Sequence, residues 1–199
     1  MTAVLNVTSS ISGRAWRWRG GWEGARQAGG LNEDLVYGLM RARGAAHEDI
    51  GLLRAPTIRE MLPDPSVFVD MDAAAARIAD GIQRGERIMI FGDYDVDGAT
   101  SAAVLIRHLR ALGATTSHYI PDRLLEGYGP SADALVALKR AGADLVVCVD
   151  CGTQGFDALG AASDAGLDVI VVDHHKASTS LPPAIAIVNP NRLDESEEG

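Results

Sequence analysis

Cysteine and aromatic residues are scarce in this sequence. Two of its 199 residues are cysteines, and Phe, Trp and Tyr together make up 5%. Two cysteines provide no disulfide framework, and the C-x-x-C pair of Cys148 and Cys151 lacks the second pair that a structural zinc site needs. Because a strand is expected to run through Cys148, the two side chains should point apart and serve as ordinary core residues.

Long apolar runs are also missing. No run approaches the roughly 20 residues of a membrane-spanning helix, and the opening MTAVLNVTSSISGRAW lacks the apolar core of a signal peptide. These absences predict a cytoplasmic protein with no membrane attachment. A hydrophobic content of 47% is nevertheless enough to bury a core in a chain of 199 residues.

The net charge is −9, but the charge is unevenly distributed. Residues 1–30 form an irregular, Gly-rich leader with four arginines and three tryptophans, namely Arg14, Arg17, Arg19, Arg26, Trp16, Trp18 and Trp22. Arginine neutralises phosphate and tryptophan stacks on bases, so the leader is a candidate contact for nucleic acid. The alternative is that these tryptophans pack on the following domain.

Apolar periodicity divides the rest of the chain into two regions. Residues 31–70 contain short helical patterns and predict a small helical extension. Residues 71–199 alternate apolar strands with amphipathic helices, which predicts an α/β domain with a doubly wound, mainly parallel five-stranded sheet. The expected strands are 88–91, 115–120, 145–149, 169–172 and 185–188, and the expected helices are 71–84, 98–112, 131–141 and 155–165.

A weak internal repeat brings polar residues into register. AGADLVVCVD (141–150) aligns with AGLDVIVVDH (165–174), and GERIMIFGD (85–93) fits the same pattern. The alignment places Asp93, Asp150 and His174 just past the ends of three strands. Open α/β sheets bind ligands at this edge, so these three side chains are expected to converge.

The segment GDYDVDGATS (92–101) sets three aspartates at alternate positions. D-x-D-x-D-G also begins a calcium-binding EF-hand loop, but Val104 occupies the position of its bidentate Glu, and the residues before the segment predict a strand. An EF-hand is therefore excluded. Carboxylates this close repel one another and raise one another's pKa, which a bound cation would relieve.

Oxygen donors from several strand ends, together with a histidine, suit Mn²⁺ or Mg²⁺, and so many donors favour two ions. For individual residues, the alternative to metal binding is a structural role in a helix cap or a turn. Asp97 precedes a helix and is placed to cap it, and Asp173 is expected in a cap or turn. The adjacent histidines of VDHHK (172–176) are harder to explain by packing, and they favour the metal site.

Three motifs in this order, GDYDVDGATS, VCVDCGT (147–153) and VVDHH (171–175), resemble the signature motifs of the DHH phosphoesterases. The segments IPDRLLEGYGPS (120–131) and IVNPNR (187–192) are similar to the RecJ branch of that family, which degrades single-stranded DNA from 5′ to 3′. The resemblance implies a two-metal phosphodiesterase acting in DNA repair and recombination. It further implies a monomer, with single-stranded DNA as substrate and a helicase and a single-strand-binding protein as partners.

The resemblance also assigns roles to residues. The implied metal ligands are Asp95, Asp97, Asp150 and His174, and Asp93 is implied either as a further ligand or as a residue that supports the ligands. Asp95 and Asp97 are also implied to take part in catalysis. His175 would contact the scissile phosphate or give it a proton. Thr100 and Ser101, at the start of a helix, are candidates to donate hydrogen bonds to a phosphate, although a capping role explains their presence there nearly as well.

The family pattern continues into a further motif with another metal-ligating aspartate and into a second domain, called DHHA1, both of which would lie beyond Gly199. The DHH domain at 71–199 is therefore expected to be incomplete, to bind metal weakly and to cleave little by itself. Two alternatives remain. One is a DHH phosphoesterase acting on short oligonucleotides or small phosphate esters, and the other is a truncated, non-catalytic fragment that binds metal or nucleic acid.

Overall fold

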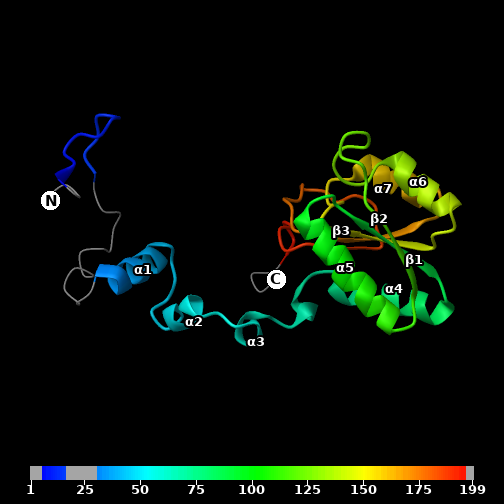
Figure 1. Ribbon diagram of the computed structural model, residues 1–199, viewed down its shortest axis with the longest axis horizontal. Coiled ribbons are helices and arrows are strands. Elements are labelled where there is room, and N and C mark those ends of the chain that lie inside the picture. The colour runs from blue at the N-terminus through cyan, green and yellow to red at the C-terminus, as the bar shows by residue number, and fades with distance from the viewer. Residues whose placement is uncertain (1–5, 17–30, 196–199) are drawn as a thin grey trace. The chain divides into compact units, whose positions relative to one another are not determined.

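The computed structural model describes residues 6–16 and 31–195, and the chain divides into two compact units between Leu62 and Pro63. The described part of the first unit contains the helices α1 (Leu31–Ala42), α2 (Ile50–Arg54) and α3 (Ile58–Met61) (Figure 1).

Trp16, in the Arg- and Trp-rich leader, is 50% exposed. The other tryptophans of the leader, together with Arg17, Arg19 and Arg26, lie outside the described residues, so the nucleic-acid contact stays a prediction.

The second unit is built on a five-stranded sheet. Its order is β2-β1-β3-β4-β5, and each neighbouring pair is parallel. The predicted fold class is therefore confirmed. The strand order reverses between β1 and β3, which is the position where sheets of this kind bind ligands. The strands are β1 (Arg87–Gly92), β2 (Thr115–Tyr119), β3 (Leu145–Val149), β4 (Asp168–Val172) and β5 (Ala186–Val188).

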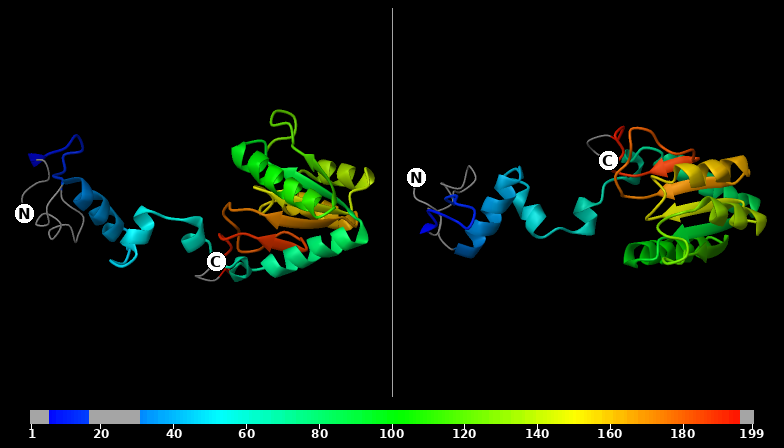
Figure 2. Two further views of the ribbon diagram at one scale, coloured as in Figure 1. Left: turned by 60° about the horizontal axis from the view of Figure 1, so that its bottom comes forward. Right: turned by 90° about the horizontal axis from the view of Figure 1, so that it is seen from above.

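Helices cover both faces of this sheet (Figures 1 and 2). Helices α4 (Met71–Arg84) and α5 (Val96–Ala111) pack on one face, and α6 (Ala132–Arg140) and α7 (Phe156–Asp164) pack on the other. The short 3-10 helix η3 (Pro65–Val67) precedes α4. Strand β3 is buried along its whole length because neither face is open to solvent. Among residues 6–16 and 31–195, no helix is long and apolar enough to cross a membrane.

The ends of two helices follow the signals expected of them. Helix α4 stops at Gly85, whose φ of 70° is the left-handed conformation that glycine adopts without strain. Ser131 caps α6 by accepting a hydrogen bond from the backbone N–H of Ala134, as the sequence predicted.

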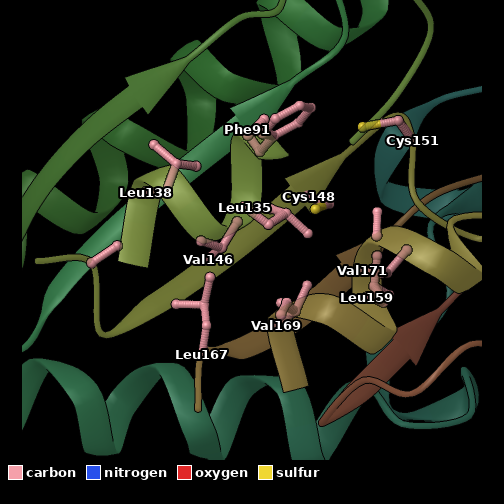
Figure 3. Packing of buried hydrophobic residues seen from close by; sticks show 14 of the residues in the cluster. Phe91, Leu135, Leu138, Val146, Cys148, Cys151, Leu159, Leu167, Val169 and Val171 are labelled. Atoms are coloured by element: carbon pink, nitrogen blue, oxygen red, sulfur yellow. The ribbon is translucent and has the colours of Figure 1, made fainter. Parts of the chain in front are cut away.

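Both cysteines belong to the core layer under α6 and α7 (Figure 3). Cys148 and Cys151 are fully buried, the neighbouring Cys148 thiol raises the pKa of Cys151, and the Cys151 thiol donates to the backbone oxygen of Val149 at 3.5 Å. The prediction that they point apart is therefore wrong. The chain turns at Asp150, whose φ is +62°, so the strand alternation that separates neighbouring side chains does not continue to Cys151.

The sheet register aligns the polar ends of four strands. The last paired row consists of Gly92, Val149, Val172 and Val188. The residues that follow this row are Asp93, Asp150, Asp173 and Asn189. The repeat in the sequence aligned Asp150 with His174, whereas in the sheet Asp173 lies level with Asp150 and His174 lies one residue further on.

Candidate metal centre

The aspartates of GDYDVDG lie between the end of β1 and the start of α5. Asp93 is 2% exposed, and burial raises the pKa of its carboxyl group. Asp95 is the N-cap of α5, and its Oδ1 accepts hydrogen bonds from the backbone N–H groups of Asp97 (2.9 Å) and Gly98 (3.1 Å). These bonds, above all the one from Gly98, lower the pKa of Asp95. The cap is therefore Asp95, and the helix begins two residues before the predicted start at residue 98.

Three predicted site residues lie in the first turns of α5. The side chain of Asp97 is exposed. The hydroxyl of Thr100 donates to the backbone oxygen of Val96 at 2.7 Å, so its proton is used within the helix. Thr100 and Ser101 both line an apolar groove of about 550 Å³ between α4 and α5. Their roles in binding phosphate, and that of Asp97 in binding metal, stay predictions.

Asp150 follows β3 and is buried, in the left-handed backbone conformation that aspartate tolerates better than most residues. Its backbone N–H donates to the oxygen of Val172 at 2.9 Å, which fixes the turn to the neighbouring strand. Burial and then the adjoining carboxyl group of Asp95 raise the pKa of Asp150. Two carboxyl groups in contact share a proton or a cation between them.

The histidines of VVDHH bring nitrogen donors to these carboxylates. Nε2 of His174 lies 3.0 Å from Oδ1 of Asp150. Nδ1 of His175 lies 2.7 Å from Oδ1 of Asp173, and this contact raises the pKa of His175. Burial opposes ionisation of Asp173, but hydrogen bonds from His175 and Thr153 outweigh it and lower the pKa of Asp173.

Polar residues around the two histidines hold their backbone in place, a role that the sequence did not reveal. Asp173 accepts from the backbone N–H groups of His174 and His175, at 2.7 and 3.2 Å. The side-chain amide of Asn189 donates to the backbone oxygen of His175 at 2.8 Å, and that of Asn191 donates to the oxygen of His174. Every backbone polar group of the two histidines is thus bonded. The recurring asparagines of IVNPNR (187–192) were the available signal.

The donors form two groups with one common member. Asp93, Asp95 and Asp150 each offer a ligand atom within 4.8 Å of the others, and so do Asp150, His174 and His175. The predicted convergence of residues from β1, β3 and β4 is therefore observed. His175, expected to contact phosphate, lies in the second group, while Asp97 lies in neither.

These residues fit a divalent cation. Oδ1 of Asp93 is buried and has no hydrogen-bond partner among the described residues. A buried carboxylate oxygen without a partner is costly, and a cation would satisfy it. Carboxylate oxygens with imidazole nitrogens suit Mn²⁺ and, with fewer nitrogens, Mg²⁺. The fold and these donors define a doubly wound α/β domain with a candidate divalent-cation centre at the carboxyl edge of its sheet.

Comparison with known proteins places this domain in a family. The family profile described as "DHH family, N-terminal domain" matches residues 87–197. The single-stranded-DNA-specific exonuclease RecJ of Bacillus subtilis is 40% identical over 158 residues, which cover 79% of this chain and 20% of the relative. The chain therefore belongs to the DHH family, as its three motifs predicted, and it spans about a fifth of the length of that relative.

Solved structures agree with this assignment. A crystal structure of exonuclease RecJ bound to manganese matches with 38% identity and a TM-score of 0.56, over 63% of this chain and 32% of that one. RecJ from Thermus thermophilus in complex with Mn²⁺ matches with 34% identity and a TM-score of 0.52, over 64% of this chain and 18% of that one.

The unpartnered oxygen of Asp93 leads to a stability prediction. We expect Asp93→Asn to raise the Tm of the metal-free protein by about 2–4 °C, because it removes a buried charge worth about 1 kcal/mol. The wild type should gain stability with Mn²⁺ and the variant should not. Thermal melts with and without Mn²⁺ measure both effects, with the exposed Asp157→Asn as control. A variant that melts lower than the wild type without metal, yet still responds to metal, would contradict this account.

Proposed function

We propose that this domain is part of a metal-dependent nuclease of the RecJ type, which hydrolyses phosphodiester bonds of single-stranded DNA from the 5′ end. One observation carries the proposal: two groups of metal donors, supplied by three strand ends, share Asp150. The similarity to proteins named as single-stranded-DNA-specific exonucleases supports the choice of substrate. DNA repair and recombination in the cytoplasm are the processes that such an activity would serve.

The cofactor in this proposal is a pair of Mn²⁺ or Mg²⁺ ions, and the manganese-bound RecJ structures support Mn²⁺. Bound divalent cations lower the pKa of water and neutralise charge on a phosphate, which are the two requirements of phosphodiester hydrolysis. The residues that would hold them are Asp93, Asp95, Asp97, Asp150 and His174.

The protein's own contribution is orientation and proton transfer. Asp95 is kept ionised by the backbone N–H groups at the start of α5, so it offers a charged oxygen without a further proton loss. Asp173 accepts from Nδ1 of His175, so Nε2, whose neighbour in this structure is the Tyr128 hydroxyl at 3.2 Å, is the nitrogen that would meet the phosphate. With its pKa raised by Asp173, His175 is suited to donate a proton to the leaving oxygen.

Cleavage of labelled DNA tests this function. With Mn²⁺, we expect the full-length nuclease that contains this domain to release mononucleotides from a 5′-labelled single strand before any loss from the 3′ end, and not to cleave a blunt duplex of the same length. His174→Ala should reduce the rate at least about 100-fold, whereas His118→Ala, at an exposed position of β2, should not. A full-length protein that binds Mn²⁺ but leaves both ends intact would overturn the proposal in favour of a non-catalytic metal-binding protein.

The choice of single-stranded DNA as substrate suggests which proteins would act with this nuclease. A nuclease that requires single strands depends on duplex unwinding and competes with proteins that coat single strands. We therefore propose a helicase and a single-strand-binding protein as partners of a monomeric enzyme. Pull-down of this chain by a single-strand-binding protein in the absence of DNA measures the second of these contacts.

A further inference from the structure

A tyrosine outside the three motifs contacts the candidate metal centre. The Tyr128 hydroxyl lies 3.0 Å from Nδ1 and 3.2 Å from Nε2 of His175. It also lies 3.3 Å from the backbone oxygen of Asp150, to which it can donate. The Tyr128 and His175 rings form a T-shaped pair with centroids 5.5 Å apart. One hydroxyl thus connects the motif that follows β3 with the motif that follows β4.

The loop between β2 and α6 directs this side chain toward the site. Gly127 and Gly129 flank Tyr128 with φ values of 81° and 73°, which residues with a side chain adopt only with strain. The carboxylate of the preceding Glu126 accepts a hydrogen bond from the Tyr119 hydroxyl at 2.5 Å, which ties the loop to the end of β2. Tyr128 is 54% exposed, so core packing does not determine where its ring lies. The flanking glycines and the hydroxyl contacts determine it.

We propose that Tyr128 is a positioning residue that orients His175 and the Asp150 turn for metal and phosphate binding. The proposal rests on the function proposed above. Asp173 holds His175 through Nδ1 at 2.7 Å, and a single polar contact leaves the imidazole free to tilt about that bond. The Tyr128 hydroxyl supplies the second contact. Its bond to the Asp150 oxygen supports the left-handed turn that directs the carboxylate of Asp150 toward both donor groups.

The chain contains a matched control for this contact. In the first unit, the Tyr37 hydroxyl lies 3.0 Å from Nδ1 of His47, and the two rings form a T-shaped pair with centroids 5.8 Å apart. This pair repeats the Tyr128–His175 geometry without any acidic residue of the candidate centre. Tyr37→Phe therefore removes the same kind of contact from a place where no metal is proposed to bind.

The experiment compares Tyr128→Phe and Tyr37→Phe in the 199-residue chain, with two readouts. NMR of the imidazole nitrogens in metal-free protein reports the environment of each histidine, and calorimetric titration reports Mn²⁺ affinity. We expect Tyr128→Phe to shift the His175 nitrogens and to weaken Mn²⁺ binding about 10-fold, as loss of an outer contact to a metal site typically does. Tyr37→Phe should shift the His47 nitrogens and leave Mn²⁺ affinity unchanged. Unchanged His175 signals in Tyr128→Phe would overturn the proposal.

Failure of this inference and failure of the proposed function give different results. If the wild type does not bind Mn²⁺ but Tyr128→Phe shifts His175, the positioning role stands and the metal-dependent function fails. If the wild type binds Mn²⁺ and Tyr128→Phe matches it in either readout, the positioning role fails alone. If Tyr128→Phe does not fold, the test is made on the wild type. The proposal then requires nuclear Overhauser contacts between the Tyr128 and His175 rings, and their absence overturns it.

Discussion

Replacing Asp150 with asparagine should weaken Mn²⁺ binding at least about 100-fold while leaving the fold intact. Asp150 belongs to both donor groups, so one substitution removes a ligand from each. Asparagine is the appropriate replacement because it has the same shape and tolerates the φ of +62° that this position requires. Calorimetric titration with Mn²⁺ measures the loss, and circular dichroism shows that the fold remains.

Two comparisons make this result specific. Asp157→Asn changes the same residue type at an exposed position in the first turn of α7 and should bind Mn²⁺ as the wild type does. Asp150→Ala removes the same carboxylate but is less compatible with the left-handed turn, so it should also lower the Tm. If Asp150→Asn bound Mn²⁺ with the affinity of the wild type, Asp150 would not be a metal ligand shared by the two donor groups.

Gly98→Ala should destabilise the protein by about 3 kcal/mol, or about 6–12 °C in Tm. A Cβ added at Gly98 would lie 2.5 Å from the backbone nitrogen of Asp93, closer than real atoms approach. Helix α5 would have to move away from the end of β1, and Asp93 and Asp95 would separate from Asp150. We therefore expect the variant to lose Mn²⁺ binding together with stability, measured by thermal melts and by titration.

Gly160→Ala provides the opposite control. Gly160 also lies within a helix, α7, and a Cβ there would meet nothing within 4 Å. Alanine is favoured over glycine in a helix by about 0.5–1 kcal/mol, so this variant should melt slightly higher than the wild type. If Gly98→Ala also melted higher than the wild type, the gain in helix propensity would outweigh the clash with the Asp93 backbone. The close packing of α5 against Asp93 described above would then be contradicted.

The fold could be predicted because the strands are covered on both faces. LVVCV (145–149) and IMIF (88–91) are continuous apolar runs that a half-exposed sheet would not produce, and both are strands. Helix α4 matches its predicted range because an apolar stripe runs to Gly85. The start of α5 was misplaced because three nearby aspartates could each cap the helix. The choice of Asp95 depends on side-chain geometry that spacing does not reveal.

Much of the candidate site could also be predicted, since carboxyl ends of parallel strands meet at one edge. Asp93, Asp150 and His174 were placed there by their positions after apolar runs. Asp173, expected in a cap or turn, accepts from the backbone N–H of His175 two residues on, as a turn residue does, and it also holds the ring of His175. Tyr128 was missed because its contact depends on how an irregular loop folds over two strand ends, and no periodicity marks such a contact.

The most direct test of the account is a crystal of this protein soaked in Mn²⁺, with diffraction data collected to reveal the anomalous signal of manganese. The account predicts anomalous density bounded by the carboxylates of Asp93, Asp95 and Asp150 and by the imidazole of His174. Density only elsewhere on the protein, or none at Mn²⁺ concentrations that saturate the calorimetric titration, would contradict the claim that these strand ends form a divalent-metal centre.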